Sequence, residues 1–370
     1  PMVIADALRG VVGTFVQQTT PGQGIPIVRG LKGSEVLHLV DGVRLNNALF
    51  RNAQNQYLAL IDPAVIDRIE VVRGPVSSLY GSDAMGGVVQ VLTRRPRSDP
   101  SQPRTGINAL YRTADSAAGL QAWSQFGGEP FGVRVSASHL NVGDRRTGDG
   151  ERIRPSGYES SAASVAAAWR PTETQQWHFD LQYLRQPNTP RVDELVPGFG
   201  QDEPASEQFT FEPNTRLFGR VGFEMQTAWP WADEFEANVS FQRIDDDRTT
   251  QDTGSLEFRE ERNASELWGL TGQFYKSLDD RFDLVYGVEL YADDVHSSRS
   301  AVSIDSGDRR VVTSRFPNGS ELNSIAAYAH VTGQLTPRFK LLAGARYSQF
   351  DVTLPSADRG IGADLDIDDL

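Results

Sequence analysis

A polar segment near the N-terminus carries the side chains best suited to binding a small molecule. Residues 46–57 are rich in asparagine and glutamine, and Arg44 and Arg51 lie before and within them. Amides offer both hydrogen-bond donors and acceptors, while guanidinium groups bind carboxylates or catecholates through two parallel hydrogen bonds. The amides could instead satisfy the backbone groups of a loop. The segment therefore predicts either a ligand contact or an ordinary polar loop.

Residues that could catalyse reactions or hold metals lack the spacing for that chemistry. The chain has no cysteine, and its five histidines, His38, His139, His178, His296 and His330, are scattered without a metal-ligand pair. There is no nucleophile elbow, phosphate-binding glycine loop or dinucleotide fingerprint. Asp245-Asp246-Asp247 does not have the spacing of a calcium loop and is interpreted as a solvated loop base at the outer end of a strand. We expect no catalytic residue, metal site or cofactor, and hence no enzyme.

Composition excludes some partners and one kind of membrane protein. The net charge is −13 over 370 residues, which argues against nucleic acid and favours cationic or neutral ligands. No apolar run reaches about 18 residues, so no helical membrane span is expected, whereas a β-barrel never needs such a run. The N-terminus shows no signal segment, so we expect export to be encoded outside this sequence.

Short apolar strands bounded by glycine surround the polar segment. They are expected at residues 27–31, 36–46, 69–73 and 88–92. Arg73-Gly74-Pro75 must end one of them, because proline has no N–H to donate and glycine permits a tight turn. Residues 94–102 are rich in arginine, proline and serine. We place a domain boundary there, with one domain at 1–97 and another at 104–370.

Beyond residue 104 apolar and polar positions alternate, which is typical of half-exposed β-strands. Trp177, Phe179, Leu181 and Tyr183 alternate with His178, Asp180 and Gln182, and the pattern recurs at 234–242, 282–290 and 339–348. It predicts about eleven strands of about 12 residues, the last ending near Val352. One face is apolar and the other polar, as in a soluble sandwich or a membrane barrel.

The expected connections alternate in length. Short links are expected near 127–130, 171–175, 229–233, 278–281 and 336–337, and long ones near 143–157, 188–212, 249–262 and 296–320. An up-and-down membrane barrel has tight turns at one end and long loops at the other, whereas a sandwich has no reason to alternate. Aromatic residues near strand ends fit interfacial belts or core anchors equally well, and they are Trp169, Trp177, Trp229, Trp231 and Tyr347.

In order and spacing, the N-terminal blocks resemble the plug domain of TonB-dependent outer-membrane receptors. The matching pieces are Asp6-Ala7-Leu8, Val28-Arg29-Gly30, Leu39-Val40-Asp41-Gly42, Arg68-Ile69-Glu70-Val71, Gly74-Pro75, Leu79-Tyr80-Gly81 and Gly86-Gly87-Val88-Val89. The resemblance implies a small α+β plug domain followed by an antiparallel transmembrane β-barrel. Family barrels have about 22 strands, so we expect a fragment that holds the plug domain and the N-terminal half of the barrel. Such a half-barrel should not insert stably by itself.

The resemblance also implies roles for single residues. The outward plug loop would be residues 46–57, with a second apex at 77–83. The candidate ligand-binding residues are therefore Arg44, Asn46, Asn47, Arg51, Asn52, Gln54, Asn55, Gln56, Tyr57 and Ser82. Arg29, Arg73 and Gly74 match positions that anchor the plug, where the arginines pair with glutamates on the inner barrel wall. Glu224, Glu236 and Glu289 are candidate partners, because a charge buried in the lumen needs one.

Receptors of this family import scarce nutrients across the outer membrane of Gram-negative bacteria. The expected ligand is a small metal chelate, an iron-siderophore or haem. The expected partners are the inner-membrane energy-coupling protein TonB and outer-membrane lipid. Residues 186–195 resemble the haem and haemoglobin receptor branch, but the loop at 46–57 lacks the histidine that this branch often places there. Two alternatives stay open, a surface β-rich module for glycan binding or adhesion, and a soluble enzyme on a β-scaffold.

Overall fold

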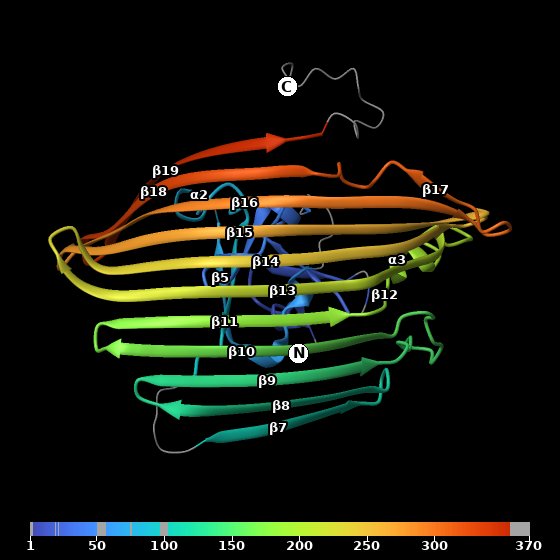
Figure 1. Cartoon of the computed structure of the whole chain (residues 1–370), viewed down its shortest axis with the longest axis horizontal. Helices are drawn as coiled ribbons and strands as arrows, with labels where there is room; N and C mark the ends of the chain where they lie inside the picture. Colours follow the sequence, from blue (N-terminus) through green and yellow to red (C-terminus); the bar gives the residue numbers. More distant parts are fainter. Residues whose placement is uncertain are drawn as a thin grey trace.

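The computed structural model describes residues 3–18, 20, 22–49, 57–74, 76–96 and 103–355. Two large sheets are present, one of four strands near the N-terminus and one of 13 strands that follows. The smaller sheet lies against one face of the larger, curved sheet, so that in Figure 1 its blue elements appear behind the long strands. This arrangement confirms the expected plug and barrel fold.

The plug is built around two parallel buried strands. β3 (Val36–Val40) pairs in parallel with β6 (Gly87–Thr93), while β4 (Val43–Arg44) and β5 (Ile66–Arg73) flank them as antiparallel edges. A separate hairpin pairs β1 (Thr14–Gln17) with β2 (Ile25–Val28). Short turns complete the unit, namely α1 (Ile4–Ala7), η1 (Gly33–Glu35), η2 (Tyr57–Leu60), η3 (Pro63–Val65) and α2 (Ser77–Tyr80). β5 ends at Arg73, where the sequence predicts a strand end.

The glycine pair before β6 allows two elements to approach closely. Gly87 has φ +149°, and a Cβ there would lie 2.2 Å from the carbonyl oxygen of Val72 on β5. A Cβ on Gly86 would lie 2.9 Å from the carbonyl oxygen of Val28. Neither position has room for a side chain, so the sequence Gly86-Gly87 is required by packing.

The larger sheet is an antiparallel meander, and its main path contains eleven strands, as predicted. The path runs through β7 (Arg104–Arg112), β8 (Ala117–Gly128), β9 (Phe131–Val142), β10 (Tyr158–Thr172), β11 (Gln175–Gln186), β13 (Ser206–Trp229), β14 (Ala232–Asp252), β15 (Glu257–Asp279), β16 (Phe282–Ser303), β18 (Ser320–Thr336) and β19 (Phe339–Thr353). The long connections also contain β12 (Thr189–Pro190), α3 (Val192–Leu195) and β17 (Arg309–Val312). Within the described residues, β7 and β19 are the two edges of the sheet.

Four central strands are longer than the sequence suggests. β13 to β16 contain between 21 and 24 residues, where about 12 were expected. The region 249–262, expected as a long loop, is mostly strand, and only residues 253–256 separate β14 from β15. Asp245-Asp246-Asp247 therefore lies inside β14, and Asp246 is fully buried, so its interpretation as a solvated loop base is wrong. The strands continue beyond their alternating apolar segments, where backbone pairing with the neighbouring strands persists and the ion pair Asp246–Arg248 is buried.

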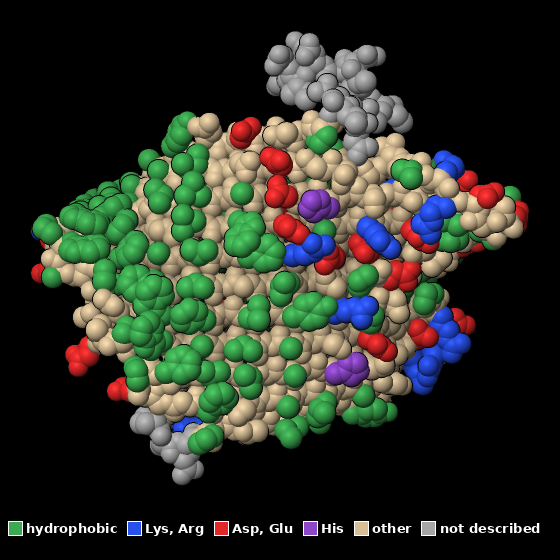
Figure 2. Space-filling view, viewed as in Figure 1, with side chains coloured by type: hydrophobic (Ala, Val, Ile, Leu, Met, Phe, Trp, Pro, Cys, Tyr) green, Lys and Arg blue, Asp and Glu red, His purple; other side chains and the backbone are tan. Residues whose placement is uncertain are grey.

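The two faces of the sheet differ in polarity as the alternation predicts. On β11, Phe179, Leu181 and Tyr183 are exposed, whereas His178 and Gln182 are buried toward the plug. Figure 2 shows hydrophobic side chains over much of the outer face, with most basic groups toward the end where β12 and β17 lie. At the short-turn end, Trp177 contacts Phe223 with ring centroids 4.5 Å apart, and Trp229 stacks on Trp231 at 4.6 Å. Among the described residues, no helix is long and apolar enough to cross a membrane.

Candidate functional site

Asp83 connects the two plug segments that the sequence predicts as ligand apices. Its carboxylate forms an ion pair with Arg44 and accepts a hydrogen bond from Asn46 Nδ2 at 2.9 Å. Ser82, at the exposed surface, donates to the same carboxylate at 3.2 Å. Asn46 also accepts a hydrogen bond from the backbone N–H of His38 at 2.9 Å and is almost fully buried. Three candidate ligand-binding residues, Arg44, Asn46 and Ser82, thus converge on a carboxylate that lies in the predicted second apex, 77–83, but is not itself among the candidates.

Among the other candidates in this loop, Asn47 and Tyr57 make contacts elsewhere. Asn47 accepts a local hydrogen bond from the backbone of Leu49 at 3.1 Å. Tyr57 is buried and reaches the barrel wall. Arg51, Asn52, Gln54, Asn55 and Gln56 lie outside the described residues.

His38 is buried next to Asn46, where a positive charge on the imidazole is disfavoured. It is buried in β3, with Nδ1 3.3 Å from Asn46 Oδ1. Burial lowers the pKa of His38 to about 4, and the hydrogen bond with Asn46 opposes this shift only in part. The imidazole is therefore neutral at physiological pH.

Toward the long-loop end, a tyrosine of the plug contacts a buried ion pair on strand β14 of the wall. Tyr57 donates its hydroxyl to Asp246 on β14 at 2.7 Å. Arg248 binds the same carboxylate with two hydrogen bonds, of 2.8 and 2.6 Å. Its guanidinium lies over the ring of Phe211 at 4.9 Å. Both side chains are buried, and removing their charges from water is costly. The two short hydrogen bonds between them offset this cost.

Further toward the short turns, the inner faces of β11 and β13 hold the plug through two more charged groups. Arg220 pairs with Asp180 at 3.2 Å and donates to the backbone carbonyl of Asp41 in the plug. Arg95, which follows β6, pairs with Glu224 at 2.7 Å. His178 lies 3.2 Å from the same glutamate. These contacts place Arg220 and Glu224 of β13 against the plug.

Strands β14, β16 and β19 also make polar contacts with the plug. Arg346 on β19 pairs with Glu289 at 2.5 Å and donates to the carbonyl oxygen of Leu79 at 3.2 Å. Asp293 on β16 accepts the backbone N–H of Ala48 at 2.5 Å. Gln242 on β14 donates to the carbonyl oxygen of Leu45 at 3.1 Å. Polar contacts from several strands therefore hold the plug.

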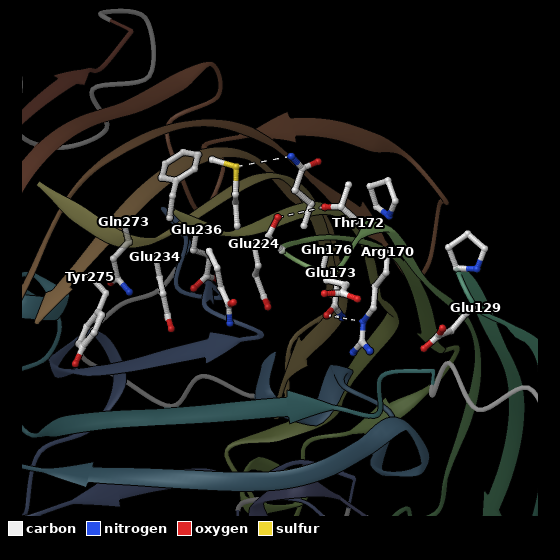
Figure 3. Close-up of a pocket in the computed structure, with 17 residues that line it drawn as sticks. Glu129, Arg170, Thr172, Glu173, Gln176, Glu224, Glu234, Glu236, Gln273 and Tyr275 are labelled. Atoms are coloured by element: carbon white, nitrogen blue, oxygen red, sulfur yellow. Dashed lines mark hydrogen bonds between the residues drawn. The ribbon is translucent and has the colours of Figure 1, made fainter. Parts of the chain in front are cut away.

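Two adjoining cavities lie along the wall toward the short-turn end, and one of them also borders the plug. The inner one, of about 400 Å³, lies between the plug strands and the wall and is lined by Arg44, Glu289 and Tyr291 among others. The outer one, of about 790 Å³, lies at the short turns, where Glu224, Glu234 and Glu236 project to the same side (Figure 3). Glu224, Glu236 and Gln273 line both cavities. The shared lining gives a predominantly acidic space along the wall.

Comparison with known families identifies both units. The TonB-dependent receptor plug domain family matches residues 3–88, and the TonB-dependent receptor-like β-barrel family matches residues 157–363. The chain belongs to the TonB-dependent receptor family.

Individual relatives of this TonB-dependent receptor are consistent with that membership. A hemin receptor of Yersinia pestis is 40% identical over 135 residues, which is 36% of this chain and 18% of that protein. The solved copper transporter OprC has a TM-score of 0.81 at 18% identity, over 95% of this chain and 53% of that one. The ferric citrate transporter FecA, unliganded, has a TM-score of 0.72 at 16% identity, over 95% and 54%. The receptor chain thus spans about half the length of these solved structures, and the likeness to them shows the fold alone.

The predicted anchoring residues of the receptor make their described contacts within the plug. Arg73 donates to the carbonyl oxygen of Val12 at 2.8 Å, which connects the end of β5 to the N-terminal segment. Arg29 has φ 53°, and its Nη1 would lie 2.8 Å from a Cβ on Gly74. The glutamates suggested as their partners have other contacts. Their contacts are Glu224 with Arg95, Glu289 with Arg346, and Glu236 with Asn238 at 3.2 Å. A role for Arg29, Arg73 and Gly74 in anchoring the plug to the wall stays a prediction.

Several residues that join plug and wall in this receptor are missing from the predicted set. They are Arg95, Asp246, Arg248, Asp293 and Arg346. A signal for the wall residues does exist, because each occupies an inward position of the alternating pattern. Charged residues at inward positions need partners in the lumen, which could have identified this set.

Proposed function

We propose that this receptor imports a scarce iron chelate, haem or an iron-siderophore, across the outer membrane of a Gram-negative bacterium. The observation that carries the proposal is the plug seated against the concave wall by polar contacts on β11, β13, β14, β16 and β19. A plug held this way must rearrange before a ligand passes, which calls for an energy source. The identity to a hemin receptor and the likeness to a ferric citrate transporter support an iron chelate.

The proposed ligand contact is the plug loop at residues 46–57. Its amides and Arg51 would meet the ligand, while Arg44, Asn46 and Ser82 position the loop against the second apex through Asp83. Asn47 and Tyr57 would support the same loop from the plug and from the wall. In this arrangement a ligand that moves the loop also acts on the contacts that hold the plug.

The proposed partners follow from the same mechanism. TonB, from the inner membrane, would pull on the N-terminal segment and remodel the plug, and lipid would surround the apolar outer face. No bond in the ligand needs breaking, so the activity is transport and not catalysis. Family members are receptors and transporters, as the names of the matched proteins state.

Ligand titration of the purified full-length receptor tests this proposal. Haem binding would shift the Soret absorbance, and an iron-siderophore would quench tryptophan fluorescence. We expect saturable binding of one of these chelates and increased expression of the gene under iron starvation. Binding of neither chelate, with expression unaffected by iron, would exclude an iron chelate and favour cobalamin, a sugar or another metal chelate.

A further inference from the structure

A cavity lined by arginines lies between the plug and the wall at strands β8 and β9. Its volume is about 690 Å³, within the range of small-molecule sites. The plug contributes Arg68, Arg94 and Arg95, and the wall contributes Arg104 and Arg134. Among the described residues, the carboxylates that line it are Asp41 and Asp67. This concentration of positive charge is unexpected in a chain whose net charge is −13.

The nearby carboxylates neutralise only part of this charge. Arg68 pairs with Glu70 at 2.7 Å and with Asp67 at 3.5 Å, and Arg95 pairs with Glu224 at 2.7 Å. Asp41 is occupied by Thr93, whose backbone N–H and hydroxyl it accepts at 2.9 and 2.7 Å. Arg94 donates to the carbonyl oxygen of Ile66 at 3.0 Å, which is a neutral acceptor. The positive charge of Arg94 therefore faces the cavity without a carboxylate contact among the described residues.

The buried side chain of Arg134 also indicates that this cavity binds an anion. It is only 7% exposed, and its guanidinium lies over the ring of Trp123 at 4.2 Å. Within the described residues its Nη2 has no hydrogen-bond partner and the side chain forms no ion pair. A buried guanidinium without an anion is costly, and the proximity of Arg94 adds repulsion. Among the described residues, neither Arg94 nor Arg134 has a carboxylate partner.

We propose that this cavity binds a small soluble anion with several phosphate or carboxylate oxygens, and that the anion connects the plug to the wall. Arg94 comes from the plug and Arg134 from the wall, so one anion between them replaces repulsion with attraction on both sides. Guanidinium groups match these oxyanions through paired hydrogen bonds. Leu120 and Phe126, exposed on the opposite face of β8, show that the cavity faces the lumen and not the lipid. The ligand therefore enters from solution.

Calorimetric titration of the full-length receptor in detergent tests this site. Pyrophosphate and citrate serve as probes, and sodium chloride at the same ionic strength is the reference. Screening of charges by salt is the same in the probe and reference solutions, so a difference between them reports binding. We expect saturable binding of at least one probe. Arg94→Gln and Arg134→Gln should each weaken it about tenfold or more, since each removes one charge-assisted contact. Arg310→Gln is the matched control, because Arg310 pairs with Glu257 at the long-loop end and should leave binding unchanged.

A second measurement separates binding from folding. The anion should raise the melting temperature of the wild-type receptor, and this rise should be smaller in Arg94→Gln at the same anion concentration. If Arg134→Gln fails to fold, Arg104→Gln at the exposed rim of the cavity takes its place and should weaken binding likewise. Absence of saturable binding of both probes, or wild-type affinity in Arg94→Gln, would overturn the proposal. Ligand import is measured separately, so its failure would not affect this result.

Discussion

Asp83 connects two segments of the plug through its contacts with Arg44 and Asn46. Replacing it with asparagine keeps the shape but leaves Arg44 without its ion pair in a half-buried site. Loss of a charge-assisted hydrogen bond in such a site costs about 2 kcal/mol. We expect Asp83→Asn to destabilise the plug by about that amount, measured as faster amide hydrogen exchange across residues 36–46.

The neighbouring serine provides the control for this substitution. Ser82 is exposed and makes one contact with the same carboxylate, so Ser82→Ala should change stability by less than about 0.5 kcal/mol. Equal exchange rates in Asp83→Asn and wild type would show that Asp83 does not hold the two apices together.

His38 makes plug stability depend on pH. Burial lowers its pKa to about 4 in the folded protein, from 6.5 when exposed. Between these values the unfolded chain binds a proton that the folded chain does not, so stability rises with pH in this window. The contribution is complete above about pH 6.5 and is lost as pH falls toward 4, a change of about 3 kcal/mol.

Urea unfolding of the plug at several pH values measures this effect. His38→Gln removes the titrating group, so its stability should vary less between pH 6.5 and 4 than that of the wild type. Parallel pH profiles for the two proteins would mean that His38 does not remain neutral in the fold.

Tyr57 tests the buried contact between the plug and β14. Tyr57→Phe removes the hydroxyl that donates to Asp246, while Arg248 keeps its two hydrogen bonds to that carboxylate. A buried hydrogen bond to a charged group is worth about 1.5–3 kcal/mol. We expect proteases to cleave the plug of Tyr57→Phe faster than that of the wild type, and an unchanged rate would contradict the role assigned to this contact.

At the scale of elements, the close approach of β6 to β5 depends on glycine. A methyl group at Gly87 would meet the carbonyl oxygen of Val72, which is backbone and cannot move aside cheaply. Gly42 also has positive φ, +82°, but nothing lies within 4 Å of its Cβ position. Gly87→Ala should therefore destabilise the plug by several kcal/mol, and Gly42→Ala by only about 1 kcal/mol. Thermal unfolding measures both, and equal losses would show that backbone strain, not the steric clash, decides the cost.

The strands and their two faces were predictable because they depend on local pattern. Period-2 alternation places Phe179 and His178 on opposite faces of the sheet, and the end of β5 at Arg73 follows from glycine and proline chemistry. Strand length was not predictable in the same way. β14 continues through Asp245-Asp246-Asp247, because buried partners compensate for charges that the local pattern assigns to a loop.

The contacts between plug and wall depend on information that local pattern does not contain. Alternation shows that Glu224 points inward, but not that Arg95 opposes it, because the register between two separate units depends on their packing. The contacts around Asp83 could be predicted only in part, because they also join segments that are distant in sequence. Arg44, Asn46 and Ser82 lie together, whereas the residue that joins them, Asp83, is distant from Arg44 and Asn46 in sequence.

At the scale of the whole molecule, the sheet is curved and its strands β7 and β19 are edges within the described residues. The apolar outer face and the aromatic contacts at the short turns suit a membrane environment, and the polar concave face holds the plug. Together these features join a curved wall to a plug that polar contacts and a shared cluster of buried apolar side chains hold in place. The proposed import would require these contacts to be released and formed again.

Uptake by iron-starved cells tests the central claim of energy-coupled iron import most directly. Radiolabelled iron would be supplied as haem or as an iron-siderophore to cells with the gene, without it, and without TonB. The account predicts that one of these chelates accumulates only when both the gene and TonB are present. Uptake of both chelates that is unchanged by loss of the gene would contradict it.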